Sequence, residues 1–506
     1  RASRGPAKGA SVITASGWGW RYAGRPDWAV RGVDFTIEDG ERVLLLGASG
    51  AGKSTVLAAL TGVLGSADEG TEEGRLLIDG KHPTRVRGRV GLVMQDPESQ
   101  VVLAKVGDDV AFGCENMGLP RQEIWPRVHR ALDAVGLRVP MDQPTGALSG
   151  GQKQRLAIAA ALAMQGSTAD SAGPGILCLD EPTANLDPAG IVEVRDAIGR
   201  VVADRTTTLL VVEHRVDVWA DLVDRIIVLG SEGLLADGPV AQVLAERTAE
   251  LLAAGVWVPG VPHSLSPRPV RPSGQPLLWT EDLTTGYQAS QPVGRNLTVT
   301  IPEGLSTVIT GPNGAGKSTL ALTLAGLLRP LAGRVRTATG LQPEPRQRGR
   351  RSSRTLDPAD PHTWTSRHLL TRIGTVFQQP EHQFVERRVR EELAVGLRAL
   401  DWPQPRIDRR VSELLEILHL TGLATANPFT LSGGEQRRLS VGTVLATSPA
   451  LIVLDEPTFG QDRNTWTDLV QLVLQILAEG RTIISVTHDP AYLEVLAENR
   501  PMIRSG

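Results

Sequence analysis

Short, uninterrupted apolar runs recur along the chain and are typical of strands buried on both faces. They occur at Val43–Gly47, Ile176–Asp180 and Leu209–Glu213, and again at Thr307–Gly311, Leu451–Asp455 and Ile483–Thr487. Runs of this length, rich in branched residues, fit a central, largely parallel sheet that is covered on both sides. Helix-forming segments lie between them, such as the one that starts at Lys53. The pattern therefore predicts an α/β fold that occurs twice.

The two halves also repeat the same three motifs in the same order. The pairs are GASGAGKST (Gly47–Thr55) with GPNGAGKST (Gly311–Thr319), LSGGQKQR (Leu148–Arg155) with LSGGEQRR (Leu431–Arg438), and LDEPT at Leu179–Thr183 and Leu454–Thr458. The second half has about 19 additional residues between its first two motifs, and the first half has about 8 between its second and third. We expect both insertions to be surface loops, which folds tolerate well.

The insertions and the joint between the halves are polar or rich in proline. Arg-rich Gln347–Arg354 is interpreted as a solvated loop, with a contact to lipid headgroups or to a partner as the alternative, and Gln165–Gly175 as a loop. Six prolines between Pro259 and Pro276 indicate a semi-extended linker. We divide the chain into an N-terminal tail (1–10), a first domain (11–250), a linker (251–276) and a second domain (277–506).

Each glycine-rich motif matches GxxxxGK[ST], a loop that binds phosphate and opens a helix. Glycines let backbone N–H groups turn toward phosphate oxygens, and the helix N-terminus favours the anion. Lys53 and Lys317 would reach the β- and γ-phosphates, and the Ser54 and Ser318 hydroxyls would bind Mg²⁺. These lysines are two of six among 53 basic residues, at a place where Arg is not equivalent. The expected nucleotide-binding residues are Gly47, Ser49, Gly50, Ala51, Gly52, Lys53, Ser54, Thr55, Gly311, Asn313, Gly314, Ala315, Gly316, Lys317, Ser318 and Thr319.

An Asp-Glu pair ends one apolar run in each half. Asp180 and Asp455, at the predicted strand ends, are expected to hold Mg²⁺. Glu181 and Glu456 would then polarise the attacking water. A lone Asp-Glu pair is usually a solvated turn, but here four apolar residues precede it and Pro-Thr follows it, in both halves.

Histidines and glutamines recur at matching places beside these motifs. His214 and His488 each follow a later apolar run, where a histidine can contact the γ-phosphate and orient water, although a lone histidine is more often structural. Gln95 and Gln378 each follow a short apolar run and precede Pro-Glu-x-Gln. We expect these glutamines to sense Mg²⁺ and the attacking water.

Two further features are candidates for contacts with the nucleotide. Tyr22 and Tyr287 precede the glycine loops by similar distances, so either ring could stack on adenine or simply pack in the core. The LSGG motifs place Ser and Gly at a helix start, a second anion-binding end that suggests engagement of the other half's nucleotide. The residues concerned are Ser149, Gly150, Gly151, Ser432, Gly433 and Gly434.

Composition narrows the classes of function. The formal net charge of −3 over 506 residues disfavours a nucleic-acid binder that relies on bulk charge, so no nucleic-acid partner is expected. Cys114 and Cys178 are the two cysteines, which excludes a disulfide-stapled secreted domain and a four-thiolate metal site built from this chain alone. No run of 18 apolar residues occurs, and the N-terminus lacks the apolar core of a secretory signal.

Together these motifs resemble those of the ATP-binding-cassette (ABC) superfamily. The resemblance covers nearly the whole chain, because the motif set occurs once in each half. The resemblance implies two nucleotide-binding domains, each a RecA-like P-loop core with a helical subdomain, that pair head to tail around two ATP with Mg²⁺. One site would combine Gly47–Thr55, Gln95, Asp180, Glu181 and His214 with Ser432–Gly434. The other would combine Gly311–Thr319, Gln378, Asp455, Glu456 and His488 with Ser149–Gly151. Asp187 and Asp462 match the position through which such sites communicate, and two competent sites are expected because neither has lost its Lys, Glu or His.

Several shorter sequence segments are similar to those of the energy-coupling factor (ECF) importers of vitamins and metal ions. These segments are QDPESQ, QQPEHQF, Asp108–Leu119, Arg390–Leu397, Glu456–Asp462 and Val212–Arg215. The resemblance implies fused A and A′ ATPases at the cytoplasmic face of the cell membrane. They would drive a transmembrane T subunit, docked near Pro97–Gln100 and Pro380–Gln383, and a substrate-binding S subunit. Only 18 residues follow His488, so we expect the last strands and any C-terminal dimerisation helices of the second half to be either missing or truncated, and we assume no accessory C-terminal interface.

Three other classes compete with this interpretation. A soluble tandem-cassette ATPase that acts on ribosomes typically has a long charged helical arm between cassettes, whereas this joint is short and proline-rich. A tandem sugar-importer ATPase usually has a degenerate second phosphate loop, whereas GPNGAGKST is intact. A DNA-repair cassette protein would need zinc cysteines that this sequence lacks.

Overall fold

The computed structural model describes residues 11–48, 50–65, 69–164, 175–184, 186–230, 233–266, 274–344, 356–499 and 501. The chain divides into two compact units, Arg1–Val261 with Asp462–Asn464, and Pro262–Gln461 with Thr465–Gly506, and each is described by itself. The expected N-terminal tail, the Arg-rich loop Gln347–Arg354, Ser49 and all of the loop Gln165–Gly175 except Gly175 lie outside the described residues.

The first unit is built on a six-stranded sheet with the order β5-β6-β7-β3-β8-β9. All neighbouring strands are parallel except β9, which runs antiparallel to β8. Its strands are β1 (Ser11–Tyr22), β2 (Val30–Glu38), β3 (Arg42–Gly47), β4 (Gly70–Ile78), β5 (Val90–Val93), β6 (Ile176–Asp180), β7 (Thr208–Val212), β8 (Arg225–Gly230) and β9 (Gly233–Pro239). Its helices are α1 (Lys53–Leu60), α2 (Val106–Asn116), α3 (Arg121–Ala134), α4 (Gly150–Met164), α5 (Pro188–Val201), α6 (Val216–Trp219), α7 (Val240–Glu246) and α8 (Thr248–Ala253).

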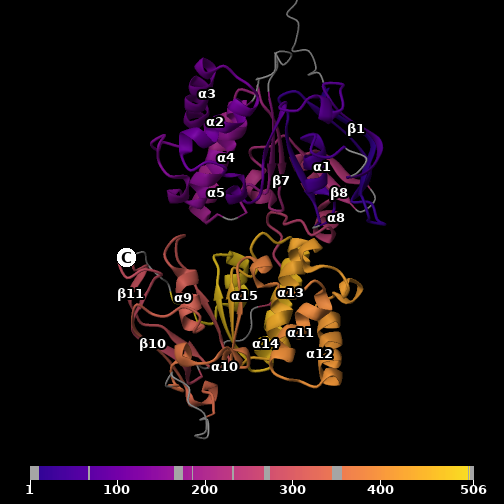
Figure 1. Ribbon diagram of the computed structural model, residues 1–506. Coiled ribbons are helices and arrows are strands. Elements are labelled where there is room, and N and C mark those ends of the chain that lie inside the picture. The colour runs from indigo at the N-terminus through magenta and orange to yellow at the C-terminus, as the bar shows by residue number, and fades with distance from the viewer. Residues whose placement is uncertain are drawn as a thin grey trace, which may run out of the picture. The chain divides into compact units, whose positions relative to one another are not determined.

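Both faces of this sheet are covered, which explains the uninterrupted apolar runs. Successive side chains of a strand point to opposite faces. Leu44 and Leu46 of β3 accordingly join the core beneath α2–α5, whereas Val43 and Leu45 join a second core with α1 and the antiparallel sheet β2-β1-β4. Figure 1 shows α2–α5 gathered on one side of β7, with β1 and α1 on the other.

The second unit repeats this plan with a shorter sheet. Its core sheet has the order β13-β17-β16-β15 and is parallel throughout. Its strands are β10 (Pro276–Thr285), β11 (Gly294–Leu297), β12 (Thr300–Pro302), β13 (Ser306–Ile309), β14 (Ala332–Thr337), β15 (Ile373–Val376), β16 (Leu451–Asp455) and β17 (Thr482–Val486). Its helices are α9 (Lys317–Leu324), α10 (Ser366–Leu370), α11 (Val389–Ala399), α12 (Gln404–Ile417), α13 (Gly433–Ala446), α14 (Arg463–Ala478) and α15 (Pro490–Leu496).

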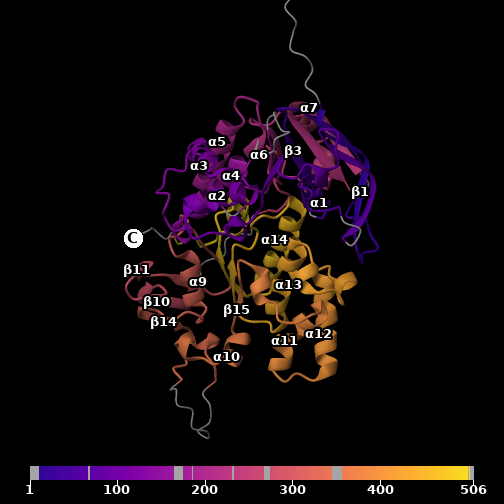
Figure 2. The ribbon, with the colours of Figure 1, turned by 45° about the horizontal axis from the view of Figure 1, so that its top comes forward.

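Helices again cover one side of this sheet and an antiparallel layer the other. Helices α11, α12 and α13 pack side by side, as Figure 2 shows. Strand β10 pairs with β11, β12 and β14, and these strands share a core with α9. The expected doubled α/β fold is thereby confirmed.

The ends of the apolar runs differ slightly from expectation, and the second core sheet is smaller. Strands β7, β13 and β17 begin and end a residue or two before the expected runs. Among the described residues no strand of the second unit follows β17; Asn499 forms only an isolated parallel bridge with Thr307. In the first unit, β8 runs parallel to β3 at the corresponding place.

Candidate functional site

The two phosphate loops connect a core strand to a helix in each unit. Helix α1 starts at Lys53 after Gly52, whose φ of 88° lies in the left-handed region, and α9 starts at Lys317 after Gly316, with φ 82°. A Cβ at Gly52 would lie 2.5 Å from the Ala29 carbonyl oxygen, so the loop has no room for a side chain there. The glycines therefore fix how the loop enters the helix.

The loop lysines point back into their own loops. The Lys53 ammonium donates to the carbonyls of Gly47 (2.8 Å) and Ala48 (3.0 Å), and Lys317 donates to the corresponding carbonyls of its loop. Both side chains are buried, and burial lowers the pKa of Lys53. A desolvated ammonium beside a glycine loop at a helix N-terminus is the arrangement that attracts phosphate oxygens.

A carboxylate at the end of a core strand lies against each loop helix. Parallel pairing of β6 with β7 and of β16 with β17 brings Asp180 and Asp455 to the carboxyl edge of the sheets. The Ser318 hydroxyl donates to Asp455 at 3.0 Å, and Ser54 hydrogen-bonds Asp180. Burial raises the pKa of Asp180 to about 6 and raises the pKa of Asp455. Paired hydroxyl and carboxylate oxygens are donors suited to Mg²⁺.

The next residue, Glu181, is the centre of the first unit's polar cluster. Its carboxylate accepts from Gln95 Nε2 at 2.8 Å and lies 3.0 Å from His214 Nε2. The structure therefore brings together three residues that are far apart in the sequence. Glu181 has a positive φ of 45°, which is strained for a side chain of this size, and its N–H donates to Val212 at 2.9 Å.

The second unit repeats the Glu–His pair but not the contact with glutamine. Glu456 also has φ 45°, and its carboxylate lies 3.2 Å from His488 Nε2. Burial raises the pKa of Glu456 to about 8. The Gln378 side chain is exposed, and among the described residues no hydrogen bond joins it to Glu456.

A buried arginine holds the backbone at this glutamine instead. Arg437, on α13, donates to the carbonyls of Phe377 (2.8 Å) and Gln378 (2.6 Å). Burial lowers the pKa of this guanidinium to about 10. The equivalent residue of the first unit is Gln154, so the two units hold this segment in different ways.

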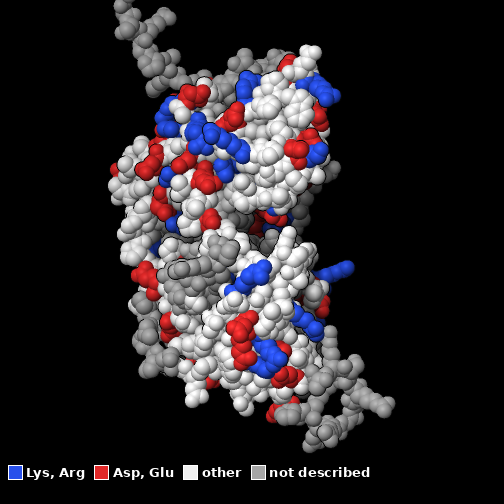
Figure 3. All heavy atoms as spheres, turned by 90° about the vertical axis from the view of Figure 1, so that its left-hand side faces the viewer, with Lys and Arg blue, Asp and Glu red and all other residues white. Residues whose placement is uncertain are grey.

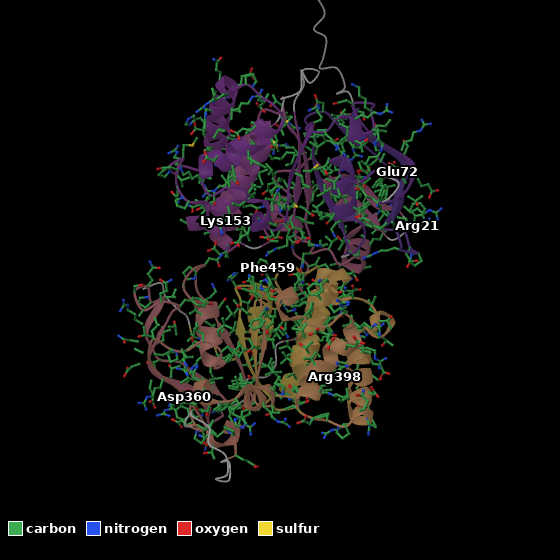
Figure 4. All side chains as sticks on the ribbon, viewed as in Figure 1. Arg21, Glu72, Lys153, Asp360, Arg398 and Phe459 are labelled. Carbon is green, nitrogen blue, oxygen red and sulfur yellow. The ribbon has the colours of Figure 1, made fainter. Side chains whose placement is uncertain are left out.

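The LSGG segments begin the long helices α4 and α13. Ser432 caps α13 in a capping box with Glu435, and Ser149 exchanges similar contacts with Gln152. Gly150 and Gly433 are exposed at these helix starts. Lys153, one turn into α4 and marked in Figure 4, forms a 2.6 Å ion pair with Glu98.

The two tyrosines differ in their surroundings. The Tyr22 hydroxyl lies 3.2 Å from the Thr55 hydroxyl on α1, and its ring meets Trp20 edge-on. Tyr287 is 69% exposed. Stacking on adenine stays a prediction for both rings, but only Tyr22 is positioned by the phosphate-loop helix.

Four further polar residues lie beside these clusters, and none of them was expected from the sequence to be a site residue: Glu213, Thr183, Thr458 and Asp489. Thr183 donates to Glu213, and Thr458 donates to Asp489 at 2.8 Å. The sequence does indicate Glu213, which ends the apolar run Leu209–Glu213, because a carboxylate after four buried apolar residues requires partners.

Figure 3 shows Lys and Arg interspersed with Asp and Glu over the described residues of one face. Among the described residues no helix has the length and apolar character needed to cross a bilayer.

Comparison with known proteins identifies the family. A family model described as "ABC transporter" matches residues 30–184 and 295–459. "Putative HMP/thiamine import ATP-binding protein YkoD" of Bacillus subtilis is 32% identical over 497 residues, covering 92% of this chain and 85% of the relative. A "Putative ABC transporter ATP-binding protein" of Methanosarcina acetivorans is 32% identical over 529 residues, covering 94% and 82%.

A solved structure shares the tandem fold. The "Model of ribosome-bound archaeal Pelota and ABCE1" matches with a TM-score of 0.62 and 20% identity, covering 96% of this chain and 77% of that chain. At this identity the likeness concerns the fold alone. The two matched segments contain both phosphate loops, both Asp-Glu pairs and both LSGG motifs. The chain therefore belongs to the ABC transporter family, as an ATPase with two tandem ATP-binding cassettes.

Proposed function

We propose that this protein is the energy-coupling ATPase of an ECF-type importer, in which two fused cassettes drive a transmembrane T subunit and a substrate-binding S subunit. The observation that carries the proposal is that each cassette has a complete set of groups for hydrolysis. The segments that begin at Gln95 and Gln378 also resemble those of ECF importers. The relative named as an HMP/thiamine import protein supports an import role. Such a protein would act at the cytoplasmic face of the membrane.

Within each cassette the proposed roles follow from the chemistry of the groups. Lys53 and Lys317 bind the β- and γ-phosphates, and the adjacent serines with Asp180 and Asp455 hold Mg²⁺, which neutralises charge on the phosphates. Glu181 and Glu456 accept a proton from the attacking water, oriented by His214 and His488. Gln95 and Gln378 report the state of the γ-phosphate to the surface beside them.

We further propose that each nucleotide is completed by the LSGG segment of the other cassette, Ser432–Gly434 for the first site and Ser149–Gly151 for the second. Exposed glycine N–H groups at a helix start are suited to the γ-phosphate. Fusion through the linker raises the effective concentration of each cassette for the other, so pairing does not await a bimolecular encounter. ATP binding would close the pair, and phosphate release would reopen it.

The T subunit is proposed to dock beside the turns η2 (Pro97–Gln100) and η6 (Pro380–Gln383). Each turn is followed by an exposed valine, Val102 (58% exposed) and Val385 (73% exposed). In the first cassette Asp109 accepts the Val102 N–H at 2.8 Å, and in the second Glu392 accepts the Val385 N–H at 2.9 Å. A carboxylate clamp thus presents an apolar side chain to solvent in both cassettes, as a docking surface for a partner helix requires.

Replacement of both valines by aspartate tests this function. Val102→Asp with Val385→Asp should abolish co-purification of a membrane subunit from native membranes and leave ATP binding intact. Val63→Asp is the matched control, because Val63 is 63% exposed but belongs to the segment after α1. Unchanged co-purification would overturn the docking surface, and sedimentation with ribosomes rather than membranes would overturn the import role.

Charge reversal at Glu98 and Glu381 is a second test of the same surface. Glu381→Lys should weaken T-subunit binding. Glu98→Lys also breaks the 2.6 Å ion pair with Lys153, so a control variant, Lys153→Met, separates that loss from the loss of docking. Docking is refuted if Glu381→Lys and Glu98→Lys both retain the membrane subunit.

A further inference from the structure

The two cassettes hold an equivalent buried threonine with carboxylates from different positions. Thr183 and Thr458 follow the Asp-Glu-Pro of each cassette, and both are buried. The Thr183 hydroxyl donates to Glu213, the residue before His214. The Thr458 hydroxyl donates to Asp489, the residue after His488. The carboxylate therefore precedes the histidine in the first cassette and follows it in the second.

In the first cassette, Glu213 connects the strand-end segment to the histidine. It is 5% exposed, and its Oε1 accepts from the Thr183 hydroxyl and, at 3.3 Å, from the Thr183 N–H. Its Oε2 accepts the His214 N–H at 3.3 Å. Within the described part of the chain Glu213 has no ion pair with Lys or Arg. One carboxyl group thus joins both backbone segments that carry the Glu181–His214 contact.

In the second cassette the same position is Thr487, which is uncharged. Its hydroxyl hydrogen-bonds the carboxylate of Glu456. Asp489 accepts the hydrogen bond of the buried Thr458 hydroxyl and also accepts from Trp466 Nε1 at 2.6 Å. Glu456 therefore has a hydroxyl donor beside it, whereas its counterpart Glu181 has a second buried carboxyl group nearby.

We propose that Glu213 is a positioning residue for hydrolysis in the first cassette, and that it makes the two ATP sites chemically unequal. By bridging Thr183 and the His214 backbone, it sets the 3.0 Å approach of His214 to Glu181. The second site obtains the same geometry from Thr487 and Asp489. The proposal rests on the assignment of Glu181 and Glu456 as the groups that activate water.

The test uses the purified full chain with Glu456→Gln, in which only the first site would hydrolyse ATP. Adding Glu213→Gln should lower kcat by about tenfold or more, because an imprecise catalytic contact is costly, and should leave KM for ATP within about twofold. If Glu456→Gln alone stops all hydrolysis, then hydrolysis at one site requires a competent second site. In that case Glu213→Gln should lower kcat of the otherwise wild-type chain to the same extent.

Transplanting the arrangement of the second cassette distinguishes positioning from a general packing role. Glu213→Thr alone should behave like Glu213→Gln. Glu213→Thr with Arg215→Asp moves the carboxylate to the other side of His214 and should recover most of the lost kcat. Arg215 also pairs with Asp217 at 2.9 Å, so Arg215→Asp alone is the control for the loss of that ion pair. Exposed Glu115→Gln is the control for loss of a carboxylate from this cassette.

Two results overturn the inference. One is an unchanged kcat for a folded Glu213→Gln chain. The other is a double variant that is folded, as judged by a cooperative unfolding transition, but is as slow as Glu213→Thr. Failure of the proposed function itself gives a different result, namely undiminished hydrolysis when Glu181→Gln and Glu456→Gln are combined.

Discussion

Replacing Glu213 by glutamine should protect the first cassette against alkaline unfolding. Burial, together with the charge of Glu181, raises the pKa of Glu213 from 4.5 to about 7. A carboxyl group whose folded-state pKa is raised favours the fold while it is protonated. Its contribution is fully present below the unfolded-state pKa near 4.5 and is lost as the pH rises through about 7. Glutamine has nearly the same shape and does not titrate.

The magnitude follows from the size of the shift. At ~1.36 kcal/mol per pKa unit, the rise from 4.5 to about 7 corresponds to about 3 kcal/mol. Between about pH 5 and about pH 8.5, wild type should lose about 2–3 kcal/mol of unfolding free energy through this group. Since about 1 kcal/mol shifts the midpoint of a domain of this size by roughly 2–4 °C, its midpoint should fall by roughly 5–10 °C relative to Glu213→Gln.

Calorimetry of the full chain without nucleotide or Mg²⁺ measures this effect. Wild type, Glu213→Gln and the control Glu115→Gln are compared at both pH values, and the transition that responds is assigned to the first cassette by limited proteolysis. Glu115→Gln should follow wild type at both. If wild type and Glu213→Gln differ by the same amount at the two pH values, Glu213 does not titrate as its burial requires, and the reasoning is refuted.

Three further predictions concern the water-activating glutamates, the phosphate-binding lysine and the buried arginine. Combining Glu181→Gln with Glu456→Gln should reduce phosphate release by at least about a hundredfold while labelled ATP still binds, because the groups that accept the water proton are gone; release near the wild-type rate would contradict this. Lys53→Ala should weaken ATP binding at the first site, which titration with a fluorescent nucleotide detects as one lost site; two unchanged sites would exclude the assigned role. Arg437→Met should leave the Gln378 carbonyl and its neighbour without donors, lowering the urea midpoint by the equivalent of about 1–3 kcal/mol; an unaltered midpoint would show that other groups replace the guanidinium.

The repeat and its chemistry were accessible from the sequence because they depend on local pattern. A parallel strand buried on both faces must be apolar throughout, so six short runs were enough to predict two α/β units. The phosphate loops were equally accessible, since Gly52 and Gly316 occupy positions where a side chain meets neighbouring atoms. The positions of Asp180 and Asp455 at strand ends followed from the same runs.

Other features depend on which strands are neighbours, and that is decided only when the sheet is assembled. Pairing of β6 with β7 brings Glu181 to His214, and Glu181 has a φ of 45° there, which no local pattern indicates. The difference between the sites has the same origin. Glu213 precedes its histidine and Asp489 follows the matching one. Only the folded structure shows that both carboxylates accept a hydrogen bond from the equivalent buried threonine. A sequence determines which groups a segment can offer, whereas burial and pairing determine which of them must satisfy one another.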